Sequence, residues 1–227
     1  MSRIVRTALV VATALALSGC FDLTQRLTID RGGGGHYETA ITASGLLGEA
    51  LKDKKQPLSL GRNRTRARIA VGQNGKVTQS AIIDFKSLST LRFSDESLSL
   101  TNHGASWFGI GPSHLTFRRT FLVDRARREN MRGRPNEDND KLGGEMLQTM
   151  FGDHAYVFGI TVPGWVERAA PIRMGKTTFA AQVSGSGLSR TVTWRMPLYT
   201  LLQAKLVKFE VDFSAYGSFA DAQSSPE

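Results

Sequence analysis

The residues that could do chemistry in this chain are one cysteine, four histidines and many arginines. Cys20 is the only cysteine, so the chain can form no internal disulfide and no cysteine-rich zinc site. No two histidines have the spacing of a metal-binding motif such as HExxH. They are His36, His103, His114 and His154. We therefore interpret them as scattered surface or turn residues, and we predict no metal site and no other cofactor.

The sequence contains no recognisable catalytic motif. The stretch Gly175–Thr178 resembles the end of a phosphate-binding loop, but the glycine that should stand five residues before Gly175 is Ala170. A GxSxG nucleophile elbow is also absent. A hydrolase would need a Ser/His/Asp or two-carboxylate arrangement that only folding could assemble. We therefore predict that the protein is not an enzyme.

The first twenty residues assign a role to the cysteine. Arg3 and Arg6 precede an apolar run, Ala8 to Leu17, which as a helix is about 15 Å long and too short to cross a hydrocarbon core of about 30 Å. The run ends in Leu17-Ser18-Gly19-Cys20, which resembles the bacterial lipobox. This resemblance implies cleavage before Cys20, a diacylglycerol on its thiol and a further acyl chain, such as palmitate, on its new amino terminus. The alternative is an ordinary signal peptide with a chance cysteine, which leaves the order of these features unexplained.

The residue after the cysteine bears on the destination. In bacteria with two membranes, Asp at this position resembles an inner-membrane retention signal, and here the position holds Phe21. We therefore expect a protein of the bacterial cell envelope, anchored by its lipid in the outer membrane and facing the periplasm.

Arginine is concentrated in two segments of a chain whose 29 Lys+Arg and 20 Asp+Glu give a net charge of +9. In the first segment, arginines recur at every second residue, so an extended strand would project them from one side. They are Arg62, Arg64, Arg66 and Arg68. In the second segment, between 118 and 134, seven arginines stand against two acids.

We predict that these arginines bind an anionic head group of a lipid, a glycolipid or an acidic envelope polymer, because each cation near an acidic membrane contributes about 1 kcal/mol. Arg118 and Arg119 belong to this set. The alternative is a solvated edge and loop whose charge protects an exposed strand from aggregation. Nucleic acid is the usual partner of a basic protein, but an exported lipoprotein rarely meets it.

Arg119 has a second feature, because it falls on the apolar side of the alternating stretch Leu115 to Val123. A buried arginine must be paired or must line a cavity. We prefer the simpler interpretation that a β-bulge or a register shift turns it outward.

Strand patterns dominate the rest of the chain. Segments 21–30 and 36–42 flank a glycine turn, and segments 66–71 and 77–85 flank Asn74-Gly75, a pair typical of hairpin turns. Further strands are predicted at 98–100, 115–123, 156–162, 191–195 and 206–213, with short helices after Ser44, before Gly152 and after Pro197. This pattern predicts an α+β fold, mainly an antiparallel β-sheet with two or three short helices packed on it, after an N-terminal lipoprotein signal peptide. The predicted organisation is a signal peptide at 1–19, one domain at 20–213 and a flexible acidic tail at 214–227.

Several of these features together resemble the LppM-like family of bacterial lipoproteins. They are the lipobox Cys20, the strand Leu23–Asp30 with its glycine turn, the phrase Tyr156–Gly164 and the phrase Val192–Leu198. The resemblance implies an envelope-anchored α+β domain, for which binding of lipid or glycolipid has been proposed, and it carries over no catalytic residues. Some members have a C-terminal transmembrane helix, and we find no apolar run of that length here.

Two functions remain open at this point. In the first, a non-enzymatic envelope lipoprotein encloses an apolar groove for an acyl-bearing ligand, whose anionic head group meets the arginines. In the second, a structural or assembly factor binds another envelope protein through a contiguous exposed apolar patch.

Overall fold

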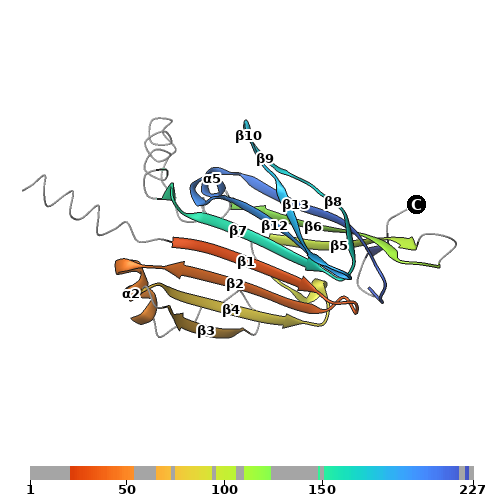
Figure 1. Cartoon of the computed structure of the whole chain (residues 1–227), viewed down its shortest axis with the longest axis horizontal. Coiled ribbons are helices and arrows are strands. Elements are labelled where there is room, and N and C mark those ends of the chain that lie inside the picture. The colour runs from red at the N-terminus through yellow and green to blue at the C-terminus, as the bar shows by residue number, and fades with distance from the viewer. Residues whose placement is uncertain are drawn as a thin grey trace, which may run out of the picture.

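A computed structural model describes residues 21–53, 65–72, 75–93, 96–105, 110–123, 148, 151–219 and 223–224, and it consists mainly of two β-sheets (Figure 1). The larger sheet has seven strands. In spatial order they are β11 (Ala181–Ser186), β12 (Ser189–Pro197), β7 (Ala155–Val162), β1 (Phe21–Ile29), β2 (Gly35–Ala43), β4 (Val77–Phe85) and β3 (Arg66–Val71). Neighbouring strands are antiparallel except for β1 and β7, which are parallel.

The second sheet has five strands, in the order β14 (Gln223–Ser224), β5 (Glu96–Ala105), β6 (Ser113–Leu122), β13 (Leu206–Ala215) and β8 (Trp165–Ala169). A small hairpin is formed by β9 (Ile172–Met174) and β10 (Thr177–Phe179). The helices are α2 (Gly45–Asp53), the 3₁₀ turn η1 (Leu88–Thr90) and α5 (Leu198–Gln203). The mainly antiparallel β fold with short helices is therefore confirmed for the described residues, but the partner layer of the first sheet is a second sheet, which the sequence pattern did not reveal.

The core lies between the two sheets, and a cluster of aromatic side chains forms part of it. Phe158 on β7 packs against Phe209 on β13, with ring centroids 4.6 Å apart, and stacks on Trp194 of β12 at 5.8 Å. All three side chains are fully buried. These close-packed rings leave no space for an acyl chain at this point between the two sheets, and the apolar groove that we expected between the sheet and the helices stays a prediction.

Strand alternation explains which side chains reach this core. In β13, Val207, Phe209, Val211 and Phe213 are buried and the residues between them face outward, as the sequence predicts. The hairpin of β3 and β4 and the helix α5, with Leu198 and Leu201 buried, also agree with the sequence. Segment 125–141 and most of the helix predicted before Gly152 lie outside the described residues.

The turn from β1 to β2 shows why the chain needs glycine there. Gly35 has a φ of 153°, and a Cβ atom at this position would lie 1.8 Å from the carbonyl oxygen of Thr28. Any side chain would therefore disrupt the pairing of Ile29 with Gly35 that closes the hairpin.

Arg119 points inward, which corrects the interpretation that a bulge turns it toward solvent. The pairing of β6 with β13 is regular on both sides of Arg119, and its side chain is fully buried. Its guanidinium contacts Glu96 at 2.8 and 3.0 Å, donates to the Tyr156 hydroxyl at 3.0 Å and donates to Gln25 at 2.7 Å. The Phe158 ring lies 4.4 Å away. Burial raises the pKa of Tyr156 to about 12, an effect that the positive charge of Arg119 partly opposes.

The flexible tail was predicted at 214–227, but its first residues belong to the fold. Ser214 and Ala215 are buried as the last residues of β13, and Phe219 is buried with its ring centroid 6.5 Å from that of Phe213. Residues 214–219 therefore belong to the folded domain, and β14 adds two further tail residues to the second sheet.

At one end of the large sheet, the first residue of β1, Phe21, lies beside the ends of the neighbouring strands. We call this the Phe21 end. Phe21 pairs with Ala43, Ala43 with Val77, and Val77 with Val71. On the other side of β1, the starts of β1 and β7 lie together because the two strands are parallel. The Phe21 backbone N–H donates to His154 Nδ1 at 2.8 Å, and the His154 carbonyl accepts from the Leu198 N–H at 2.8 Å. His154 therefore links Phe21 to the start of α5 through one hydrogen bond to each.

Candidate functional site

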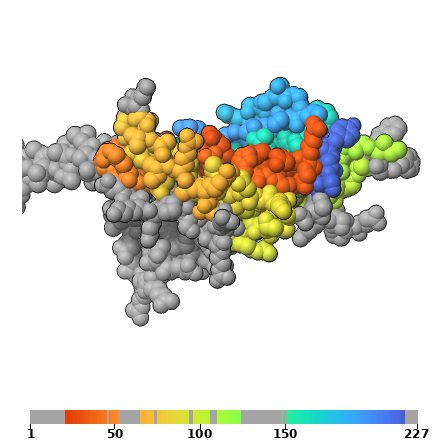
Figure 2. Space-filling model, turned by 90° about the horizontal axis from the view of Figure 1, so that it is seen from below, coloured from red at the N-terminus to blue at the C-terminus, as the bar shows by residue number. Residues whose placement is uncertain are grey.

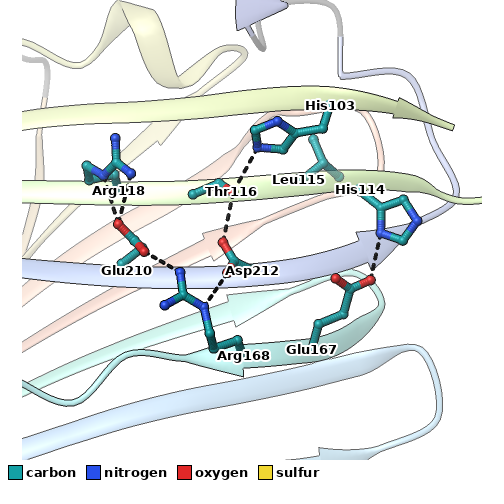
Figure 3. Close-up of a pocket in the computed structure, with 9 residues that line it drawn as sticks. All are labelled: His103, His114, Leu115, Thr116, Arg118, Glu167, Arg168, Glu210 and Asp212. Atoms are coloured by element: carbon teal, nitrogen blue, oxygen red, sulfur yellow. Dashed lines mark hydrogen bonds and ion pairs between the residues drawn. The ribbon is translucent and has the colours of Figure 1, made fainter. Parts of the chain in front are cut away.

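The outer face of the five-stranded sheet carries a polar trough of about 410 Å³ (Figure 3). It is built by the side chains that alternate with the core residues on neighbouring strands. They are His103 of β5, His114, Thr116 and Arg118 of β6, Glu167 and Arg168 of β8, and Glu210 and Asp212 of β13, and the core residue Leu115 also borders the trough.

A chain of hydrogen bonds and ion pairs crosses this trough. Arg118 Nε donates to Glu210 at 3.0 Å, and Arg168 contacts both Glu210 and Asp212, the latter at 2.6 Å. Asp212 also accepts from the Thr116 hydroxyl at 2.8 Å, and that hydroxyl lies 2.9 Å from His103 Nε2. The network therefore links four strands, as the dashed lines in Figure 3 show.

The charges in this network largely satisfy one another. Hydrogen bonds from Arg168 to Asp212 and to Glu210 raise the pKa of Arg168, so the guanidinium stays charged between two carboxylates. Arg118 has the other Glu210 oxygen as its partner, 2.9 Å away. A trough whose cations are already paired offers hydrogen bonds to a ligand but little net attraction for an anion.

Ser214, His114 and Glu167 meet at one end of the trough and have the composition of a catalytic triad. Ser214 Oγ lies 3.0 Å from His114 Nδ1, Glu167 Oε1 lies 2.8 Å from the same nitrogen, and the Ser214 hydroxyl donates to Glu167. A catalytic relay needs the hydroxyl and the carboxylate on opposite nitrogens of the imidazole. The three residues therefore form a closed hydrogen-bonded cluster, and Ser214 is itself buried.

No metal centre is formed within the described ranges, because they contain no group of three or more His, Cys, Asp or Glu side chains that could hold an ion. The trough has five such side chains, but Arg168 occupies the two carboxylates at its centre.

The structure separates the arginines that the sequence grouped. Cys20, Arg62 and Arg64 lie outside the described residues. Arg66 and Arg68 are exposed on the edge strand β3, where Arg66 forms an ion pair of 2.6 Å with Asp84. Arg118 lies in the trough, and its neighbour Arg119 points to the opposite face of β6 and is buried. Arg118 and Arg119 therefore cannot act as one head-group site.

Sequence reasoning missed most of the trough because its members are far apart in the chain. Glu167 and Arg168 precede their partners in β13 by more than forty residues. One signal was available: the alternation of 206–213 places Glu210 and Asp212 on the outer face. The sequence could not show that Arg118 and Arg168 would lie opposite those carboxylates.

Comparison with known proteins identifies no relative: no family model matches the chain, and no curated protein or solved structure matches it significantly. The resemblance to LppM-like lipoproteins therefore stays a prediction. Among the described residues, no helix is long and apolar enough to span a bilayer.

Proposed function

We propose that this chain is a non-enzymatic lipoprotein of the bacterial envelope, tethered through Cys20, whose folded body binds an anionic envelope component at its surface. The observation that carries the proposal is the direct junction between the lipobox and the fold. β1 begins at Phe21, one residue after Cys20, and lies inside the seven-stranded sheet. Its first residues are held by the bonds of Phe21 to His154 and of Asp22 to Ala155, at 2.8 and 2.9 Å.

This junction supports a body held close to the membrane. A flexible linker would let the domain move freely at the end of its tether. Here a strand of the main sheet follows the predicted lipid directly, so the Phe21 end would face the membrane surface.

The charge supports an anionic ligand. Removal of Arg3 and Arg6 with the signal peptide leaves 27 basic and 20 acidic residues, which is a net charge of +7. Attraction between such a body and an acidic surface is long-range and weakens with salt. Because packed side chains fill the described part of the core, we place the binding on the surface, and the ligand classes remain a lipid, a glycolipid or an acidic polymer.

Replacement of Cys20 by serine tests the anchor. The unchanged chain should fractionate with membranes and enter the detergent phase, because three acyl chains hold a protein firmly while one holds it weakly. Cys20→Ser should leave the protein in the aqueous phase with altered gel mobility. Ser18→Ala, which keeps a small residue in the lipobox, serves as the matched control and should behave as the unchanged chain. If Cys20→Ser alters neither fractionation nor mobility, the proposal is wrong.

A second candidate is an assembly factor for another envelope protein, and the edge strand β3 favours it. Ile69 and Val71 are 44% and 60% exposed there, beside α2, and Figure 2 shows this side of the molecule with α2 and β3 in orange to amber. An edge strand has unpaired backbone groups that a partner strand can bind. Cross-linking from position 69 distinguishes the two functions, because a defined protein adduct favours assembly and lipid adducts alone favour the first proposal.

A further inference from the structure

A second hollow, of about 480 Å³, lies between the C-terminal end of α5 and the turn that joins β9 to β10. Its size is within the range of small-ligand sites. Arg173 and Met174 approach it from the hairpin, and Thr200, Gln203, Lys205 and Leu206 approach it from α5 and the start of β13. The trough lies on the face of a sheet. This hollow instead lies between two segments that connect strands: the β9–β10 turn on one side, and α5 with the residues that lead to β13 on the other.

The charge of this hollow is positive, and no acidic residue of the described ranges compensates it. Arg173 and Lys205 line it, and none of its lining residues is acidic. Neither cation forms an ion pair with any residue in the described part of the chain, whereas Arg118 and Arg168 in the trough are both paired. Two cations with free donors are suited to an anionic oxygen cluster such as a phosphate.

The uncharged lining residues fit the rest of a lipid head group. The Thr200 hydroxyl and the Gln203 amide can donate hydrogen bonds to ester or glycerol oxygens. Met174 is partly buried, and Leu206 is 41% exposed at the margin, which provides an apolar border beside the cations. This combination matches a molecule with a phosphate and an adjoining hydrocarbon part.

The position of the hollow supports the membrane as the source of that phosphate. α5 starts at Leu198, whose N–H bonds to the His154 carbonyl, and His154 Nδ1 accepts from Phe21. The six residues of α5 advance by only about 9 Å. The head-group layer of a bilayer is several ångströms deep, so a body tethered at Cys20 can place this hollow against it.

We propose that the hollow of Arg173 and Lys205 binds the phosphate head group of a lipid in the leaflet that anchors the protein. This second contact fixes the orientation of the body on the membrane. It rests on the proposed anchor at Cys20, because tethering raises the effective head-group concentration and makes a weak site useful.

The test counts bound lipid by native mass spectrometry of the full chain, released from neutral detergent and titrated with phosphatidylglycerol or phosphatidylcholine. Arg173→Gln with Lys205→Gln should weaken phosphatidylglycerol binding roughly tenfold or more, since two surface cations are lost. Arg31→Gln with Lys86→Gln removes the same charge from exposed positions at the opposite end of the sheet, and it should change binding by less than about twofold. Equal melting temperatures of the variants would show that both remain folded.

Three outcomes would overturn this proposal. Unchanged binding in the first variant would show that the hollow is not the site, and equal losses in both variants would show a non-specific charge effect. Displacement of the lipid by millimolar glycerol phosphate would point to a soluble phosphate ester instead. None of these readouts depends on cell fractionation, so failure here is distinguishable from failure of the anchor tested with Cys20→Ser.

Discussion

Arg119 and Glu96 form an ion pair on which the stability of the core depends. The Arg119 side chain is fully buried and only 8% of the Glu96 side chain is exposed, so neither charge has water as an alternative partner. Breaking such a pair leaves a buried charge uncompensated, which costs about 3–5 kcal/mol, while replacing both partners by apolar groups can be nearly neutral.

We therefore expect Arg119→Leu to lower the free energy of unfolding by about 3–5 kcal/mol. The double variant Arg119→Leu with Glu96→Leu should lose at least about 2 kcal/mol less than the sum of the single variants, because it removes the stranded carboxylate. The hydrogen bond from Tyr156 to Gln25, 2.6 Å long, involves neither of the substituted side chains. Urea unfolding of all four chains measures this coupling, and strictly additive losses would contradict it.

At the scale of elements, the last strand and the segment after it are one structural unit. β13 lies inside the second sheet, between β6 and β8, and it leads directly to the buried Phe219. Gly217, with a φ of 158°, lets the chain pass close to the Arg31 backbone, because a Cβ atom there would lie 2.1 Å from the Arg31 carbonyl oxygen. The segment therefore closes one end of the core.

Phe219→Ala should consequently lower the free energy of unfolding by about 3 kcal/mol, as expected for a large buried ring replaced by alanine. Tyr216→Ala is the matched control, because Tyr216 is 54% exposed and its removal should cost less than about 1 kcal/mol. Thermal unfolding followed by circular dichroism measures both. If the two variants are equally stable, residues 214–219 do not contribute to the folded core and the predicted frayed tail is correct.

At the scale of the whole molecule, the proposed anchor predicts an orientation. Lys76 and Lys86 are exposed residues at the two ends of β4, with Lys76 next to the Phe21 end. The strand rises by about 3.4 Å per residue, so the two positions are roughly 30 Å apart. If Phe21 follows a lipidated cysteine, Lys76 lies near the membrane and Lys86 lies far from it.

Fluorophores on Lys76→Cys and Lys86→Cys test this orientation, because the native cysteine would be blocked by its lipid. In vesicles, head-group quenchers should quench the label at 76 strongly and the label at 86 little. Similar quenching at both positions would mean that the body lies flat or tumbles on its tether.

The pattern of apolar and polar residues along the sequence was sufficient to predict many of the strands. The alternation of 206–213, the Asn-Gly hairpin of 66–85 and the apolar run of 156–162 identified strands and their buried faces, because side-chain direction on a strand has a period of two residues. The same alternation placed Arg119 on the inner face, where the structure shows it. We expected a bulge to turn it outward because the stretch Leu115 to Val123 contains no acidic partner for a buried arginine.

The sequence by itself determined the strands, their faces, the positive charge and the predicted lipid attachment at Cys20, because each is a property of neighbouring residues. Only the tertiary structure decided that a second sheet covers the first, that Glu96 and Gln25 bind Arg119, and that Arg173 and Lys205 line one hollow. These groups come together through strand pairing and sheet packing between segments far apart in the chain, and the period of a single strand carries no information about which distant strand will cover it.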